Sequence, residues 1–290
     1  MVFACSYTRL VWEPSSDADL PYFSIWSGPK QGWIDRAGRR IHFQPEEPQS
    51  DPERLTPFRR DQLFGYMRQL KMVIAPRFLD AGEFHEGRAR VVLDGPCIPP
   101  GAGVCGASMT LPSVIISRSA TGLSVESVPL TAPACQYTFI NEAGDVVGNT
   151  KYQEARDFHE GIAAVRTNEL WGYVDRDLSV LVEPRFRSAG DFSEGLAAVR
   201  GSSGSFYVDR NSEVAIAGPF DEAGEFHEGL AVVYRNRLAF YIDKAGRQAV
   251  PGQYGSAGRF FHGLGNVRLR DGRLAYIDRN GRMVYQWKER

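Results

Sequence analysis

One seven-residue stretch of this sequence returns almost unchanged far along the chain. Ala-Gly-Glu-Phe-His-Glu-Gly occupies residues 81–87 and again residues 223–229. Shorter versions of it recur at a constant spacing of 34 residues, with their phenylalanines at Phe158, Phe192, Phe226 and Phe260. A fixed period of this size is typical of a repeat protein, in which each unit buries its apolar face against its neighbours.

The residues within one period predict β-strands. Apolar segments at 162–166, 171–175 and 180–182 are short, rich in Val and Tyr, and bounded by Gly, Asp and Pro. No window of the repeats sustains a helical apolar spacing. We therefore predict an all-β fold: tandem, antiparallel, three-stranded units in an open, curved array. A closed, propeller-like ring is the alternative, although propeller blades usually carry four strands over about 40–45 residues.

The repeat register also predicts the domain organisation. Residues 1–78 form an N-terminal cap and a degenerate first repeat with an insertion at 41–72, and residues 79–152 form a second repeat with an insertion at 93–135. Residues 153–290 hold four regular repeats that end in a cap strand. Because long insertions on a rigid scaffold often carry recognition, both insertions are candidate partner-binding segments.

The first insertion contains an apolar pattern at helical spacing. Leu63, Tyr66, Met67 and Leu70 follow this spacing, which predicts a short amphipathic helix. Capping the end of the array is its expected role, and docking a partner through Tyr66 and Met67 is the alternative.

The second insertion is rich in Cys, Pro and Gly and has no motif for phosphate or dinucleotide binding. The candidate partner-binding residues within it are Cys97, Ile98, Pro99, Pro100, Val104 and Cys105. A disulfide between Cys97 and Cys105 in an oxidising compartment and free thiols in a reducing one are both open.

Polar residues that recur in the repeat have structural explanations. The residues that end the second strand are expected to start turns: Asp35, Asn141, Asp175, Asp209, Asp243 and Asp278. Four of these turns have the type I preference of Asp or Asn first and Gly fourth: those at Asp35, Asn141, Asp243 and Asp278. The glutamates before the repeated glycines are expected to bond exposed turn amides: Glu86, Glu160, Glu194 and Glu228. His85, His159 and His227 share one register, but Ser193 interrupts it, and we expect solvated histidines rather than a metal site.

Two motifs that recur together carry a family resemblance. Phe158-His159-Glu160-Gly161 followed by Trp171-Gly172-Tyr173-Val174-Asp175 resembles the bacterial WG repeat, over most of residues 138–290 and shorter stretches before them. The resemblance implies a β-rich repeat scaffold, often suspected of protein binding, without catalytic residues common to the family. Later units lack the Trp-Gly pair.

Composition excludes several function classes. The 34 cationic and 35 anionic side chains nearly cancel, so no overall field attracts nucleic acid. No apolar run reaches the roughly 20 residues of a membrane span. Without a signal peptide, a cytoplasmic location is favoured. Val-Phe-Ala-Cys at residues 2–5 gives an alternative, a lipid anchor at Cys5 in the cell envelope if the start lies upstream.

The expected function is a non-catalytic, protein-binding scaffold that recognises its partner through the insertions and needs no cofactor or metal. An inhibitor or immunity-type protein for one toxin or enzyme is the alternative. An enzyme would have to pair Cys97 or Cys105 with His85, and no spacing supports that pair.

Overall fold

The computed structural model describes residues 23–27, 30–41, 51, 53–93, 114–119, 122–127 and 136–287. Every regular element in these ranges is a β-strand. Among the described residues, no helix is long and apolar enough to cross a membrane. The predicted all-β class is confirmed.

Apart from β8 and β9, the described strands form seven small units in chain order, of which units 2 and 3 share β6 and make one six-stranded sheet. Unit 1 holds β1 (Phe23–Ser27), β2 (Lys30–Ile34) and β3 (Arg40–Ile41). Unit 2 holds β4 (Thr56–Arg60), β5 (Leu63–Arg68) and the first part of β6 (Lys71–Ala81). Unit 3 holds the rest of β6 with β7 (Ala89–Leu93), β10 (Tyr137–Ile140) and β11 (Val146–Tyr152).

The remaining four units follow the regular 34-residue period. Unit 4 holds β12 (Glu154–Ala155), β13 (Ile162–Thr167), β14 (Leu170–Asp175) and β15 (Val180–Phe186). Unit 5 holds β16 (Ser188–Ser193), β17 (Leu196–Arg200), β18 (Ser205–Asp209) and β19 (Val214–Phe220). Unit 6 holds β20 (Glu222–His227), β21 (Leu230–Arg235) and β22 (Leu238–Ile242). Unit 7 holds β23 (Ser256–Phe261), β24 (Leu264–Arg268), β25 (Leu274–Ile277) and β26 (Met283–Trp287).

The amphipathic helix predicted around Leu63–Leu70 is wrong, because these residues form β5 and a hairpin turn. Tyr66 pairs with Ile74 and Phe64 with Phe78, as Tyr173 pairs with Val182 and Trp171 with Phe186 in unit 4. Much of the segment predicted as an insertion at 41–72 therefore has the strand pairing of a regular unit. The second insertion contains a separate antiparallel hairpin of β8 (Val114–Ser119) and β9 (Gly122–Ser127).

The core lies in the seams between units rather than inside any unit. At five seams an aromatic residue of β5, β10, β14, β18 or β22 meets, edge-on, the repeated phenylalanine of the next unit. The ring centroids are 4.8–5.0 Å apart in five seams: Tyr66–Phe84, Phe139–Phe158, Tyr173–Phe192, Tyr207–Phe226 and Tyr241–Phe260. Edge-to-face contacts of this kind stabilise beyond their buried area. The period of the phenylalanines is thus the period of the seams.

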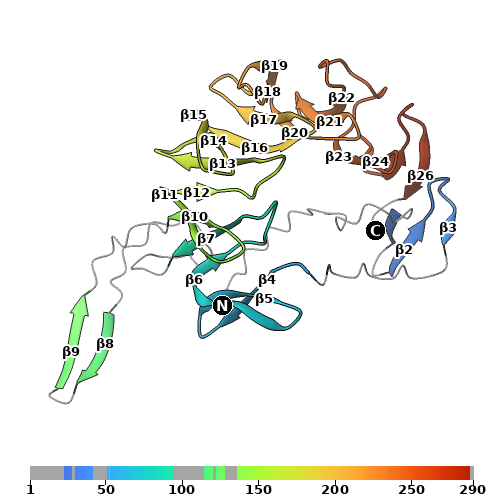
Figure 1. Ribbon diagram of the computed structural model, residues 1–290. Coiled ribbons are helices and arrows are strands. Elements are labelled where there is room, and N and C mark those ends of the chain that lie inside the picture. The colour runs from blue at the N-terminus through green and yellow to red at the C-terminus, as the bar shows by residue number, and fades with distance from the viewer. Residues whose placement is uncertain are drawn as a thin grey trace.

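The units follow one another along an open, curved arc (Figure 1). Unit 1 does not lie next to unit 2 but beside unit 7, at the far end of the chain (Figure 1). There Phe23 and Ile34 of unit 1 share a core with Leu264 and Tyr276 of unit 7. The predicted open, curved array is confirmed, with its first unit packed on its last.

Candidate functional site

Each repeated glutamate joins its unit to the next one. Glu160 accepts hydrogen bonds from the Gly195 amide at 3.0 Å and from Arg210 Nη2 at 2.7 Å, both in unit 5. The same pair of contacts recurs at three other seams: Glu86 with Gly161 and Arg176, Glu194 with Gly229 and Lys244, and Glu228 with Gly263 and Arg279. The expectation that these glutamates bond turn amides is confirmed. They form a row of clamps across the seams.

Three of the clamp carboxylates have lowered pKa values. Partial burial opposes ionisation of Glu160, but hydrogen bonds from Arg210 and from the amides of Gly195 and Glu194 outweigh it and hold its pKa below the ordinary value. For Glu86 and Glu194 burial is likewise outweighed, by Arg176 with the Gly161 amide and by the Gly229 amide with Lys244. These carboxylates are ionised at neutral pH and serve structure.

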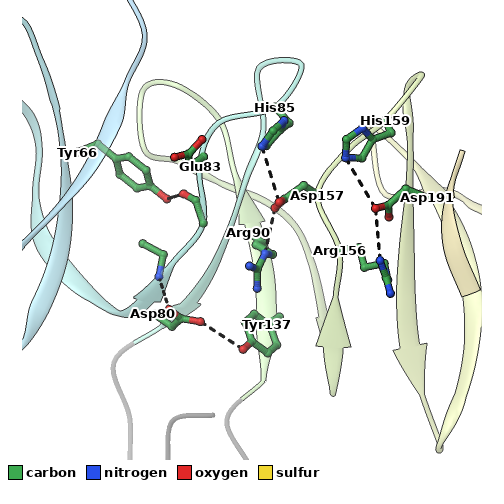
Figure 2. A network of polar contacts seen from close by, with 12 residues as sticks. Tyr66, Asp80, Glu83, His85, Arg90, Tyr137, Arg156, Asp157, His159 and Asp191 are labelled. Atoms are coloured by element: carbon green, nitrogen blue, oxygen red, sulfur yellow. Dashed lines mark hydrogen bonds and ion pairs between the residues drawn. The ribbon is translucent and has the colours of Figure 1, made fainter. Parts of the chain in front are cut away.

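A second polar row lies directly beside the repeated phenylalanines. The residue before each phenylalanine is acidic in units 3 to 6, as Glu83, Asp157, Asp191 and Glu225, and is Arg259 in unit 7. Asp157 lies 3.0 Å from Arg90 Nε and 3.8 Å from His85 Nε2, and Asp191 lies 3.4 Å from Arg156 Nη1 and 3.9 Å from His159 Nε2 (Figure 2). We call this row, with its arginines and histidines, the acid–histidine column.

The histidines of the column are closer together than the sequence suggested. The rings of His85 and His159 lie 5.5 Å apart between centroids, so neighbouring units do bring these imidazoles together. Their side chains are partly buried and approach carboxylates rather than being fully solvated. Among the described residues, however, no group of three His, Cys, Asp or Glu side chains could hold a metal ion.

Asp191 is the most unusual group of the column. Its side chain is mostly buried, and its Oδ1 atom has no hydrogen-bond partner. Burial raises its pKa, against the opposing effect of Arg156 and His159, and the carboxylates of Glu225 and Asp157 raise it further. Glu225, by contrast, has a lowered pKa because His227 hydrogen-bonds it. The column alternates acidic side chains with arginines and histidines, and it shows no nucleophile with an adjacent base.

Away from the column, a depression of about 450 Å³ opens between units 5 and 6. Backbone turns and the charged side chains of Arg200, Asp221 and Arg235 line it. Arg200 donates to the Asp221 carbonyl, and Arg235 lies over the rings of Phe220 and Phe240. These side chains are held by the fold and do not converge on one point.

The two candidate partner-binding residues of the first insertion have different positions. Tyr66 is fully buried in the seam between units 2 and 3, and its hydroxyl donates to the Gly82 carbonyl at 2.7 Å. Burial raises its pKa well above the ordinary value. Tyr66 is therefore a core residue, whereas Met67 is half-buried on the opposite face of the sheet. The six candidates from 97–105, and Cys5, lie outside the described residues.

The acid–histidine column was not predicted as a set, although the sequence contains its signal. The acidic residue stands directly before the repeated phenylalanine in four units, a position that the seam packing itself does not require. Only the stacking of the units shows that these positions lie along one face.

A family model described as a WG containing repeat matches residues 68–95, 137–171, 171–200, 206–237 and 240–272, more than half of the chain. No curated protein matches this chain. Similar solved structures include a eukaryotic initiation factor (TM-score 0.46, 11% identity, 92% of this chain and 73% of that one). They also include KlHsv2 with a replaced loop (TM-score 0.38, 12% identity, 53% of this chain and 60% of that one). A third is the WD40 β-propeller domain of Doa1 (TM-score 0.32, 10% identity, 53% of this chain and 62% of that one).

The chain spans less than two thirds of the length of the last two proteins. Because all three TM-scores are below 0.5, these likenesses say nothing about the activity or the partner of this chain.

Proposed function

This chain belongs to the family of WG-containing repeats, and on that premise we propose that it is a non-catalytic scaffold that binds a protein partner through the insertion between β7 and β10. The units supply a rigid array, and the insertion supplies the recognition.

The observation that carries the proposal is the separation of the β8–β9 hairpin from the array. Its two strands form a sheet of their own, with six paired positions from Val114–Ser127 to Ser119–Gly122. The hairpin projects away from the seven units (Figure 1). An isolated two-stranded hairpin is marginally stable in water, whereas a third strand or a packed surface stabilises it. A partner surface would supply that support.

The repeated polar residues of the array support the same proposal. The clamp glutamates, the turn aspartates and the tyrosine hydroxyls all bond groups of the array itself, as in the 2.8 Å bond from Tyr173 to the Gly190 carbonyl. These residues recur at the 34-residue spacing of the units, and the packing of each unit on the next explains that spacing. A catalytic site would need groups that converge on one substrate position instead.

The experiment replaces residues 97–134 by a short Gly-Ser linker and compares partner capture with the full chain, followed by a binding titration with each purified partner. Far-UV circular dichroism and thermal unfolding check that the array stays folded. As a matched control, Val214→Asp changes an exposed residue of the array and leaves the hairpin intact.

We expect the linker variant to lose binding at least about tenfold, because it removes the recognising surface and not the scaffold. Loss of one dominant partner would identify an inhibitor-type protein, and joint loss of several weak ones a general scaffold. Unchanged binding would exclude the insertion as the recognition element. Turnover that depends on Cys97 or Cys105 would refute the non-catalytic assignment.

A further inference from the structure

Unit 2 presents an apolar face that is buried in the other units. In unit 4 the face toward the preceding unit holds Val165, Val174 and Leu178, all buried at 8% exposure or less. By strand pairing, Phe58 and Met67 of unit 2 correspond to Val165 and Val174. Both are only half-buried, although aligned positions in units 1, 3, 5, 6 and 7 are buried, as Ile34, Ile140, Val208, Ile242 and Ile277.

Leu70 shows the same difference most sharply. Leu70 stands in the turn after β5 and Leu178 in the turn after β14, which is one residue longer, and both have a left-handed backbone with φ of 62°. Leu178 is 8% exposed and packs on the preceding unit, where a Cβ added to Gly148 would meet its Cδ1 at 3.2 Å. Leu70 is 93% exposed. A bulky apolar residue in this strained conformation is costly unless packing compensates it.

Unit 1 has the complementary uncovered face. Trp33 occupies the position of Tyr173, whose equivalents Tyr66, Phe139, Tyr207, Tyr241 and Tyr276 are buried against the next unit or the end of the array. Trp33 is half-buried. The other side of unit 1 is already used, because Phe23 and Ile34 pack on unit 7 and Arg40 donates to the Tyr285 hydroxyl at 3.0 Å. Its free side therefore bounds the gap in the arc that unit 2 bounds from the other end (Figure 1).

We infer that unit 1 and unit 2 of the same chain dock on each other and close the arc into a seven-unit ring, so that the open arc and the ring are two states of the fold. Sequence spacing favours the same chain as the occupant. Leu55 and Leu196 are aligned positions, each three residues before the aligned Phe58 and Val199. The acidic turn residue of the preceding unit lies 21 positions before Leu196, at Asp175, and 20 positions before Leu55, at Asp35. Unit 2 thus follows unit 1 at the regular period, and the effective concentration of the two faces is high.

The test uses methionine oxidation in the full chain, since oxidation follows exposure of the side chain. Met67 lies on the proposed seam. Met72 on β6 and Met283 on β26 are internal controls, because both are exposed. Val180, which corresponds to Met72 in unit 4, stays exposed although the seam between units 3 and 4 is filled. In the ring, Met67 is expected to oxidise about tenfold more slowly than Met72 and Met283, at a rate independent of protein concentration.

Two variants make the result specific. Leu70→Asp places a charge in the proposed seam, and is expected to raise Met67 oxidation towards the rate of Met72 without changing Met72 or Met283. Val180→Asp, at an exposed position of unit 4, is expected to leave all three rates unchanged. Met67 oxidation as fast as Met72 in the unaltered chain, and insensitive to Leu70→Asp, would overturn the inference. Protection of Met67 that grows with protein concentration would also overturn it, because a second copy would then cover the face.

Discussion

At the scale of single residues, the clamp glutamates decide how strongly neighbouring units hold together. Glu160→Ala leaves the Gly195 amide and Arg210 without their acceptor, and we expect a loss of about 1–2 kcal/mol in the free energy of unfolding. Glu160→Gln keeps an amide acceptor and should lose less. Denaturant unfolding measures both, with exposed Glu213→Ala as the control. Equal losses in all three variants would contradict a specific clamp.

The same carboxylates predict how stability depends on pH. The folded-state pKa values of Glu86, Glu160 and Glu194 are lowered, so their contribution is complete above the ordinary glutamate value of 4.5 and is lost as pH falls through the lower folded values. We expect the unfolding midpoint in urea to fall steeply below pH 4.5. In the Glu160→Gln variant, the fall of the unfolding midpoint at acid pH should be smaller. An unchanged slope in that variant would show that other groups cause the acid sensitivity.

At the scale of elements, the repeated Glu-Gly turns set the register of each hairpin. Glu194 and Gly195 both have positive φ, at 54° and 85°, as a two-residue hairpin turn requires. An added Cβ at Gly195 would touch nothing within 4 Å, so Gly195→Ala tests the backbone alone, and we expect a loss of about 1 kcal/mol by thermal unfolding. Gly255→Ala, at a residue without positive φ and with only ordinary contacts, should cost little. Similar losses in both variants would argue against backbone strain.

The strands and turns were predictable because they depend on local sequence. In the turn that begins at Asp175, for example, the carboxylate of Asp175 accepts hydrogen bonds from the backbone amides of Asp177 and Ser179. The false helix arose because Leu63, Tyr66, Met67 and Leu70 satisfy a helical spacing, while the first three belong to β5 and Leu70 to the turn after it. Leu63-Phe64-Gly65-Tyr66-Met67 matches Leu170-Trp171-Gly172-Tyr173-Val174 position by position. That alignment with a regular unit predicts a strand, and it is stronger evidence than the helical spacing of four apolar residues.

At the scale of the whole molecule, the packing of unit 1 on unit 7 and the acid–histidine column could not be predicted. Both depend on how the units curve, and no local pattern in the sequence records that curvature. Arg36 shows the point: it lies 3.4 Å from His262, which stands where earlier units have a clamp glutamate. The seam between the two ends therefore follows the geometry of the internal seams with a different residue pair.

A charge buried in a terminal seam and one buried in a middle seam should have different effects. Ile34 and Val174 occupy equivalent, buried positions, on the seam between units 7 and 1 and on the seam between units 3 and 4. In a repeat array each unit is stabilised by its direct neighbours, and an unpaired buried charge costs about 3 kcal/mol or more. In hydrogen-exchange mass spectrometry, Ile34→Asp should raise exchange in β2 and on the facing strands of unit 7, while units 3 to 5 keep their protection. Val174→Asp should raise exchange in units 3 and 4 together. If Ile34→Asp instead loosened units 3 to 5, the array would unfold as one body rather than seam by seam.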